Sequence, residues 1–143
     1  MKHFSFIIFL FFSLPAFSQV NSILGNWKTI DDKTGEEKSV VSIYKSDNGL
    51  YYGKIEKLFQ NPDGKCVNCK GDNKDKPILG MIIITEMKAK GDKLEGGHIL
   101  DPANGEKYNL TITYDKTSGR LKLRGSLDKL GVLGRNQFWI KSE

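Results

Sequence analysis

The sequence predicts an all-β protein, a single domain built as an eight-stranded antiparallel up-and-down β-barrel. Short segments rich in β-branched and aromatic residues alternate between apolar and polar positions, and short turn-type connections separate them at regular spacing. No segment of about a dozen residues keeps a helical apolar stripe. Strands joined in sequence order by hairpin-length turns close most economically into a barrel, because closure removes the exposed sheet edges. A sandwich or a half-open barrel is the competing fold.

The first 18 residues have the three parts of a secretory signal peptide. Lys2 precedes an apolar block from Phe6 to Leu14, and Pro15 and the small residue Ser18 follow it. The block is too short to anchor a helix across a bilayer, which takes about 20 apolar residues. We expect cleavage after Ser18 and an exported product, periplasmic or secreted, that consists of residues 19–143 and has no membrane span.

Eight segments with strand-like composition follow in order, and their connections contain turn-forming residues. Asn48-Gly49 and Asn104-Gly105 tolerate positive φ, and Asp101-Pro102 favours the start of a turn. Connections this short join antiparallel neighbours, because a parallel crossover takes a dozen or more residues. The predicted strands are Gly25–Asp31, Lys38–Lys45, Leu50–Phe59, Ile78–Lys88, Lys93–Leu100, Lys107–Tyr114, Arg120–Ser126 and Arg135–Lys141.

The charge pattern argues against nucleic-acid binding. The net charge is +5, but basic residues are interspersed with acidic ones, as in DDKTGEEK and KGDNKDK. A protein that binds a phosphate backbone clusters Lys and Arg on one stripe with aromatic residues to stack on bases. The mixed signs indicate a solvated surface.

The first and the last predicted strands carry a family resemblance. The first strand opens with Gly25-x-Trp27, and the last carries Arg135 and Trp139. This pattern resembles the lipocalin-like (calycin) barrels, in which an aromatic residue plugs the closed end and an Arg packs on it as a cation–π contact. The resemblance implies that Gly25, Trp27, Arg135 and Trp139 close the barrel structurally.

The whole chain from residue 25 to residue 141 is also similar to an exported bacterial family catalogued as domain of unknown function 2147. The matching segments are GNWKTIDDKTGEEKSVVSIY, YYGKIEKL, CVNCKGD, PILGM, GGHILDPANGEKYN, LRG and LGRNQFWIK, in that order. The resemblance implies an exported lipocalin-like barrel. It brings no activity or catalytic residue with it, and the long cysteine-bearing loop departs from well-studied calycins.

Cys66 and Cys69 form a C-x-x-C motif in a Gly- and Asp-rich loop. An even number of cysteines in an exported protein favours a disulfide. A redox-active pair remains an alternative, although a thioredoxin-type centre lies at the start of a helix and no helical pattern follows here. A metal site is the third interpretation, but a structural zinc site takes four ligands. Lys70, where a haem-attachment motif has His, excludes a c-type haem.

Two polar groups are further candidates for chemistry. Asp63, Asp72 and Asp75 invite a calcium interpretation, but the loop lacks the spacing of an EF-hand, and a solvated loop is favoured. His98 and Asp101 are a candidate acid–base pair. Residues three apart on one strand point to opposite faces, so the favoured interpretation is an outward His98 and a turn-capping Asp101.

An eight-stranded barrel is either filled by side chains or holds one small ligand. We therefore predict a module that binds a small, mostly apolar ligand or a cell-envelope protein, without metal or cofactor. The alternatives are an enzyme, using either the cysteine pair for redox chemistry or His98 and Asp101 for hydrolysis, and an envelope interaction protein with a solid barrel. The candidate pocket or polar-site residues are Tyr52, His98, Asp101, Tyr108 and Arg124.

Overall fold

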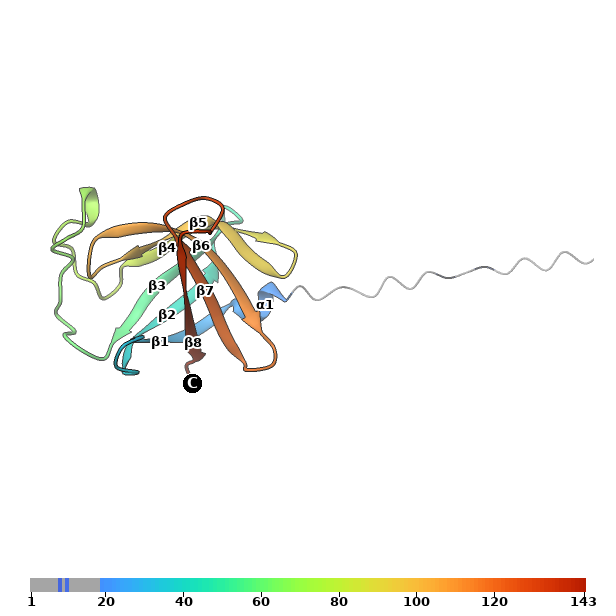
Figure 1. Cartoon of the computed structure of the whole chain (residues 1–143), viewed down its shortest axis with the longest axis horizontal. Helices are drawn as coiled ribbons and strands as arrows, with labels where there is room; N and C mark the ends of the chain where they lie inside the picture. Colours follow the sequence, from blue (N-terminus) through green and yellow to red (C-terminus); the bar gives the residue numbers. More distant parts are fainter. Residues whose placement is uncertain (1–7, 9, 11–18) are drawn as a thin grey trace, which may run out of the picture.

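The computed structural model describes residues 19–143 together with Ile8 and Leu10. Apart from these two positions, the predicted signal peptide lies outside the described residues. Eight antiparallel strands form a closed barrel in sequence order, which confirms the predicted fold (Figure 1). The elements are α1 (Val20–Ile23), β1 (Gly25–Ile30), β2 (Glu37–Lys45), β3 (Tyr51–Leu58), the 3-10 helix η1 (Gly71–Asn73), β4 (Ile82–Lys90), β5 (Lys93–Asp101), β6 (Glu106–Asp115), β7 (Arg120–Ser126) and β8 (Gly134–Lys141).

The connections divide the barrel into two unlike ends. The β1–β2, β3–β4, β5–β6 and β7–β8 connections lie at one end, which we call the open end. The other end, which we call the closed end, carries α1 and the three remaining turns. Figure 1 shows the long β3–β4 connection on the left and α1 on the opposite side of the barrel. Within the described part of the chain, no helix has the length and hydrophobicity needed to span a membrane.

The closed end is packed solid. Val20 and Ile23 of α1 are buried against the barrel, and the Nε1 of Trp27 donates a hydrogen bond of 2.8 Å to the carbonyl oxygen of Ile23. Trp27 also contacts Tyr114, with ring centroids 6.3 Å apart. The core continues toward the middle of the barrel through fully buried apolar side chains, including Ile43, Met87, Leu94, Ile112 and Leu121.

The fourth strand begins later than its sequence predicts. We expected it to begin at Ile78, whereas β4 begins at Ile82. Gly80 has a φ of +86° and donates its N–H to the carbonyl oxygen of Ile55 at 2.8 Å, so the chain turns here instead of extending. The apolar run continues across the turn because Ile78 packs against the core from the loop.

β1 and β8 close the barrel with a short ladder. Their paired residues are Trp27 with Lys141 and Lys28 with Ile140, all near the closed end. Toward the open end, side chains instead of backbone groups connect this side of the barrel. Asp32 Oδ2 accepts a hydrogen bond of 3.3 Å from the Nε2 of Gln137 and lies 3.9 Å from the Nε of Arg135.

Candidate functional site

A cavity of about 720 Å³ occupies the open end of the barrel, above the solid core. Small-molecule sites in proteins measure about 300–1,000 Å³. Of the two states that the sequence left open, a filled interior and an interior with room for one small ligand, the structure has the second at this end.

One wall of the cavity is apolar. It is built by β3 to β7 and by the β3–β4 connection, whose inward positions carry branched aliphatic side chains. Its main members are Ile55, Leu58, Ile83, Ile99, Leu110 and Leu123. Such a wall favours a ligand with an apolar body, because the free energy gained scales with the apolar area removed from water.

The opposite wall, built by β1, β2 and β8, carries hydrogen-bonding groups. Thr29 Oγ1 and Ser39 Oγ lie 2.8 Å apart and bond to each other. Gln137 and Trp139 line the same wall from β8. The alternation of β1 places Thr29 on the inward face that it shares with Trp27. Thr29 and Ser39 were not among the predicted site residues, although a hydroxyl at an inward position of a barrel strand is a signal visible in the sequence.

Trp139 carries an unsatisfied hydrogen-bond donor. Its side chain is 2% exposed, and its Nε1 is buried without an acceptor among the described residues. A buried donor without a partner costs about 1–3 kcal/mol. Trp139 lines the cavity, so a polar atom that reached its Nε1 from there would remove this cost.

Charged groups surround the mouth of the cavity, and several of them already have hydrogen-bond or ion-pair partners within the protein. Asp31 Oδ1 accepts hydrogen bonds from the backbone N–H groups of Thr34 and Lys33, and these two bonds hold the pKa of Asp31 below its usual range. Asp32 contacts Gln137 and Arg135 across the gap between β1 and β8. These contacts fix the β1–β2 turn beside the cavity.

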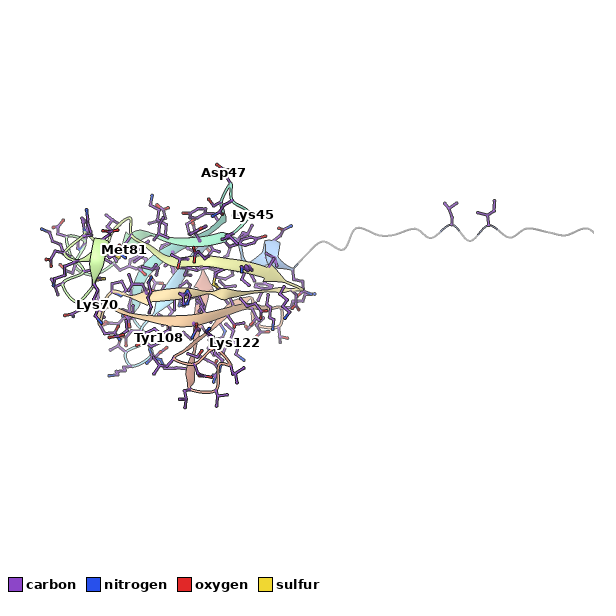
Figure 2. The ribbon with its side chains drawn as sticks, turned by 90° about the horizontal axis from the view of Figure 1, so that it is seen from above. Lys45, Asp47, Lys70, Met81, Tyr108 and Lys122 are labelled. Carbon is purple, nitrogen blue, oxygen red and sulfur yellow. A yellow bond between two sulfur atoms is a disulfide. The ribbon has the colours of Figure 1, made fainter. Side chains whose placement is uncertain are left out.

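The cysteine-bearing loop forms one rim of the cavity. Cys66 and Cys69 are joined in a disulfide, as predicted, and both side chains are buried. The loop lies on the β5–β6 turn, where Asn68 Nδ2 donates to the carbonyl oxygen of Ala103 at 2.9 Å. A Cβ on Gly105 would lie 1.9 Å from the carbonyl oxygen of Asn68, so only glycine permits this approach. Figure 2 labels Lys70 and Met81 on the β3–β4 connection.

Both cysteine side chains of this loop are shielded from solvent. Reactive cysteines are partly exposed to solvent, and neither of these is. Within the described residues, no three His, Cys, Asp or Glu side chains gather closely enough to hold a metal ion, and this includes Asp63, Asp72 and Asp75.

Two of the five predicted pocket residues line the cavity. Asp101 lies at its rim and caps its own turn, accepting a hydrogen bond of 2.9 Å from the N–H of Ala103. The hydroxyl of Tyr108 accepts a hydrogen bond of 3.0 Å from the Nδ2 of Asn104. Both side chains therefore stabilise the β5–β6 turn as well as the rim.

The other three predicted pocket residues are not part of the cavity wall. Tyr52 stacks on Tyr44 outside the barrel, with ring centroids 6.2 Å apart. His98 lies on β5 and is absent from the lining, whereas Asp101 is part of it, so the two do not form an acid–base pair in the cavity. Arg124 holds the β7–β8 connection through a 2.7 Å hydrogen bond from its Nε to the carbonyl oxygen of Gly131.

At the closed end, the cation that packs on Trp27 is not the expected one. Lys141, not Arg135, lies over the Trp27 ring, with its Nζ 4.7 Å from the ring centroid. Gly25 admits this lysine, because it has a φ of +112° and a Cβ there would lie 2.9 Å from the Nζ. Arg135 and Trp139 line the cavity at the other end. The reason is register: the ladder between β1 and β8 pairs Trp27 with Lys141.

Comparisons with known proteins agree with this fold. The chain is similar to the solved structure of a Helicobacter pylori protein, HP1028, described as belonging to the lipocalin family, with a TM-score of 0.73 and 18% sequence identity over 84% of this chain and 82% of that chain. At this identity the likeness shows the fold alone. The curated proteins contain no match. A family model described as "Uncharacterized protein conserved in bacteria (DUF2147)" matches residues 25–141. The chain therefore belongs to the DUF2147 family and has a lipocalin-like fold.

Proposed function

We propose that this protein is an exported binding protein that holds one small, mostly apolar molecule carrying a hydrogen-bond acceptor. The observation that carries the proposal is the division of the cavity into an apolar wall and a polar wall that includes Trp139, whose buried Nε1 has no acceptor among the described residues. The apolar wall takes the body of the ligand. The polar wall orients it, because an acceptor near Trp139 removes the cost of the unsatisfied donor.

The same geometry favours binding over catalysis. A general acid–base pair must converge on a substrate, and His98 lies outside the cavity lining while Asp101 caps its own turn. The buried disulfide presents no sulfur to a partner. The cavity also favours a ligand-binding barrel over an envelope protein with a solid interior.

Two related fluorescent probes test the cavity. Anilinonaphthalene sulfonate and its uncharged parent phenylnaphthylamine share one apolar body, and only the first carries a sulfonate acceptor. We expect both to bind with enhanced emission and the sulfonate to bind more tightly, because it supplies an acceptor to the polar wall. Equal affinity for the two probes would contradict the acceptor part of the proposal.

A cavity-filling variant locates the bound probe. Gly125 lines the cavity, and a Cβ there makes only an ordinary 3.6 Å contact with the Cβ of Tyr108, so Gly125→Leu adds volume inside the cavity without a backbone clash. We expect about tenfold weaker binding, which corresponds to about 1.4 kcal/mol. The control, Lys122→Leu, adds the same side chain at an exposed position of β7, labelled in Figure 2. Unchanged binding in Gly125→Leu would refute the proposed site.

A further inference from the structure

The connection between β7 and β8, residues 127–133, exposes its apolar side chains to solvent. We call this segment the apolar loop. Leu127, Leu130, Val132 and Leu133 are between 68% and 90% exposed. Large apolar side chains gathered at one exposed site mark interaction surfaces more often than single exposed ones do. Figure 1 shows the loop standing above the barrel, in dark red.

Hydrogen bonds with Asp128 and Arg124 hold the backbone of the apolar loop. The carboxylate of Asp128 accepts hydrogen bonds from the N–H groups of Val132 at 3.0 Å and Leu133 at 2.7 Å, which hold the pKa of Asp128 below its usual range. Arg124 donates to the carbonyl oxygens of Gly131 at 2.7 Å and Val132 at 3.5 Å. Four backbone groups of the loop are therefore hydrogen-bonded within the protein, two to Asp128 and two to Arg124, while its apolar side chains are exposed.

This arrangement lowers the cost of moving the loop into an apolar medium. Transfer of an unpaired backbone polar group out of water is expensive, whereas a group that is already hydrogen-bonded inside the protein pays much less. The gain is the removal of the leucine and valine side chains from water, which grows with the apolar area buried. The loop is therefore suited to partial insertion.

Charge and size point to a lipid surface. Asp128 is the one acidic residue in the sequence from Leu127 to Arg135, and its carboxylate is engaged by backbone N–H groups, whereas Lys129 is exposed beside Leu130. Aliphatic residues beside a lysine match the interface of a bilayer that contains anionic lipid. A stable protein–protein interface needs about 800 Å² from each partner, more than a projecting loop of this length offers.

We propose that the apolar loop docks the protein on anionic lipid surfaces by inserting Leu130 and its apolar neighbours while Lys129 contacts the headgroups. The inference is independent of ligand binding, but the two sites adjoin. Gly125 and Arg135, which pair across β7 and β8 just before and after the loop, both line the cavity. Docking therefore holds the mouth of the cavity close to the membrane.

Vesicle flotation tests the proposal with the chain from Gln19 onward, which contains α1 and every strand. Vesicles of phosphatidylcholine with phosphatidylglycerol are compared with phosphatidylcholine alone. We expect the protein to float with the anionic vesicles and binding to weaken as salt is raised, because ions screen the attraction of the lysine. Absence of flotation with anionic vesicles, or equal flotation with both kinds, would overturn the proposal.

Variants assign the binding to the loop. Leu130→Asp is expected to bind anionic vesicles at least about tenfold more weakly, since it places a like charge at the lipid surface. The control Val67→Asp makes the same change at another exposed apolar residue, 57% exposed on the β3–β4 connection, and should bind as the unmodified chain does. Equal losses in both variants would refute the assignment. Gly125→Leu, which fills the cavity, should float normally, so failure of the ligand proposal is separable from failure of this one.

Sedimentation without lipid tests the other occupant of the loop, a second copy of the chain. We expect a monomer whose mass does not depend on Leu130. A dimer that dissociates in Leu130→Asp would overturn the membrane proposal in favour of self-association.

Discussion

Replacing Gly105 with alanine should loosen the cysteine-bearing loop from the β5–β6 turn. Gly105 has a φ of +74°, and a Cβ there would lie 1.9 Å from the carbonyl oxygen and 2.4 Å from the carbonyl carbon of Asn68. Since real Cβ contacts are essentially never shorter than 3.0 Å, the loop must retreat by roughly 1 Å, the difference between 3.0 and 1.9 Å. The colliding atoms are backbone, so a side-chain rotation cannot relieve the clash.

The substitution has two costs, one from the retreat of the loop and one from the positive φ of residue 105. The hydrogen bond from Asn68 Nδ2 to the carbonyl oxygen of Ala103, 2.9 Å long, is stretched or lost, which costs about 0.5–1.5 kcal/mol. A left-handed alanine costs a further 1–2 kcal/mol or so. We therefore expect Gly105→Ala to lower the free energy of unfolding by about 1.5–3.5 kcal/mol, a large part of the roughly 5–15 kcal/mol that stabilises a typical domain.

Urea unfolding measures this loss, and Gly35→Ala is the matched control. Gly35 has a φ of +73°, nearly that of Gly105, but a Cβ there has no atom within 4 Å. The control therefore carries only the backbone cost, and the difference between the two variants isolates the contact between the loop and the turn. Equal losses in the two variants would refute the view that Gly105 holds the rim of the cavity.

Three further predictions concern other parts of the barrel. Lys141→Met should lower the free energy of unfolding by about 0.5–1 kcal/mol, because it removes the cation over Trp27, and Lys141→Arg should restore it; equal stability of the three proteins in urea would contradict this contact. The folded-state pKa of Asp128 lies below its unfolded value, so its stabilisation of the apolar loop is complete above the unfolded pKa and is lost as the pH falls through the folded pKa. Amide exchange should show the two N–H groups that donate to it losing protection in acid, and Asp128→Asn should abolish this dependence. The bond between Cys66 and Cys69 should resist reduced glutathione until the protein is unfolded in guanidinium, because both side chains are buried; equally fast reduction of the native protein, followed by thiol titration, would revive the redox interpretation.

Local sequence patterns predicted the strands and their order well. Alternation identifies an inward and an outward face, and turn residues such as Asn48-Gly49 mark the hairpins, so the neighbours in the sheet follow from short connections. The pattern failed at Ile78, where an apolar residue packs against the core from a loop. Composition cannot distinguish such a loop residue from a strand residue, because apolar side chains are found at buried positions whether or not the backbone there is extended.

Alternation along a strand could not predict at which level of the barrel, near the open end or the closed end, an inward side chain lies. Arg135 and Lys141 occupy inward positions of the same strand, and only the register between β8 and β1 decides which one reaches Trp27. The contact between Asn68 and Gly105 likewise depends on two loops that are distant in sequence. The disulfide was predictable because compartment and cysteine count bear on it directly, whereas the cavity depends on the volume left by all the inward side chains together.

The two tryptophans offer the most direct test of the central claim, that a ligand binds in the open-end cavity against its polar wall. The sequence has only Trp27 and Trp139, and their indole N–H signals can be followed by NMR, with Trp139→Phe providing the assignment. The Nε1 of Trp27 is bonded to Ile23 at the closed end, whereas that of Trp139 has no acceptor among the described residues. On titration with anilinonaphthalene sulfonate, the account predicts that the Trp139 signal moves as its N–H gains an acceptor and that the Trp27 signal stays in place. A bound probe that leaves the Trp139 signal unchanged would contradict it.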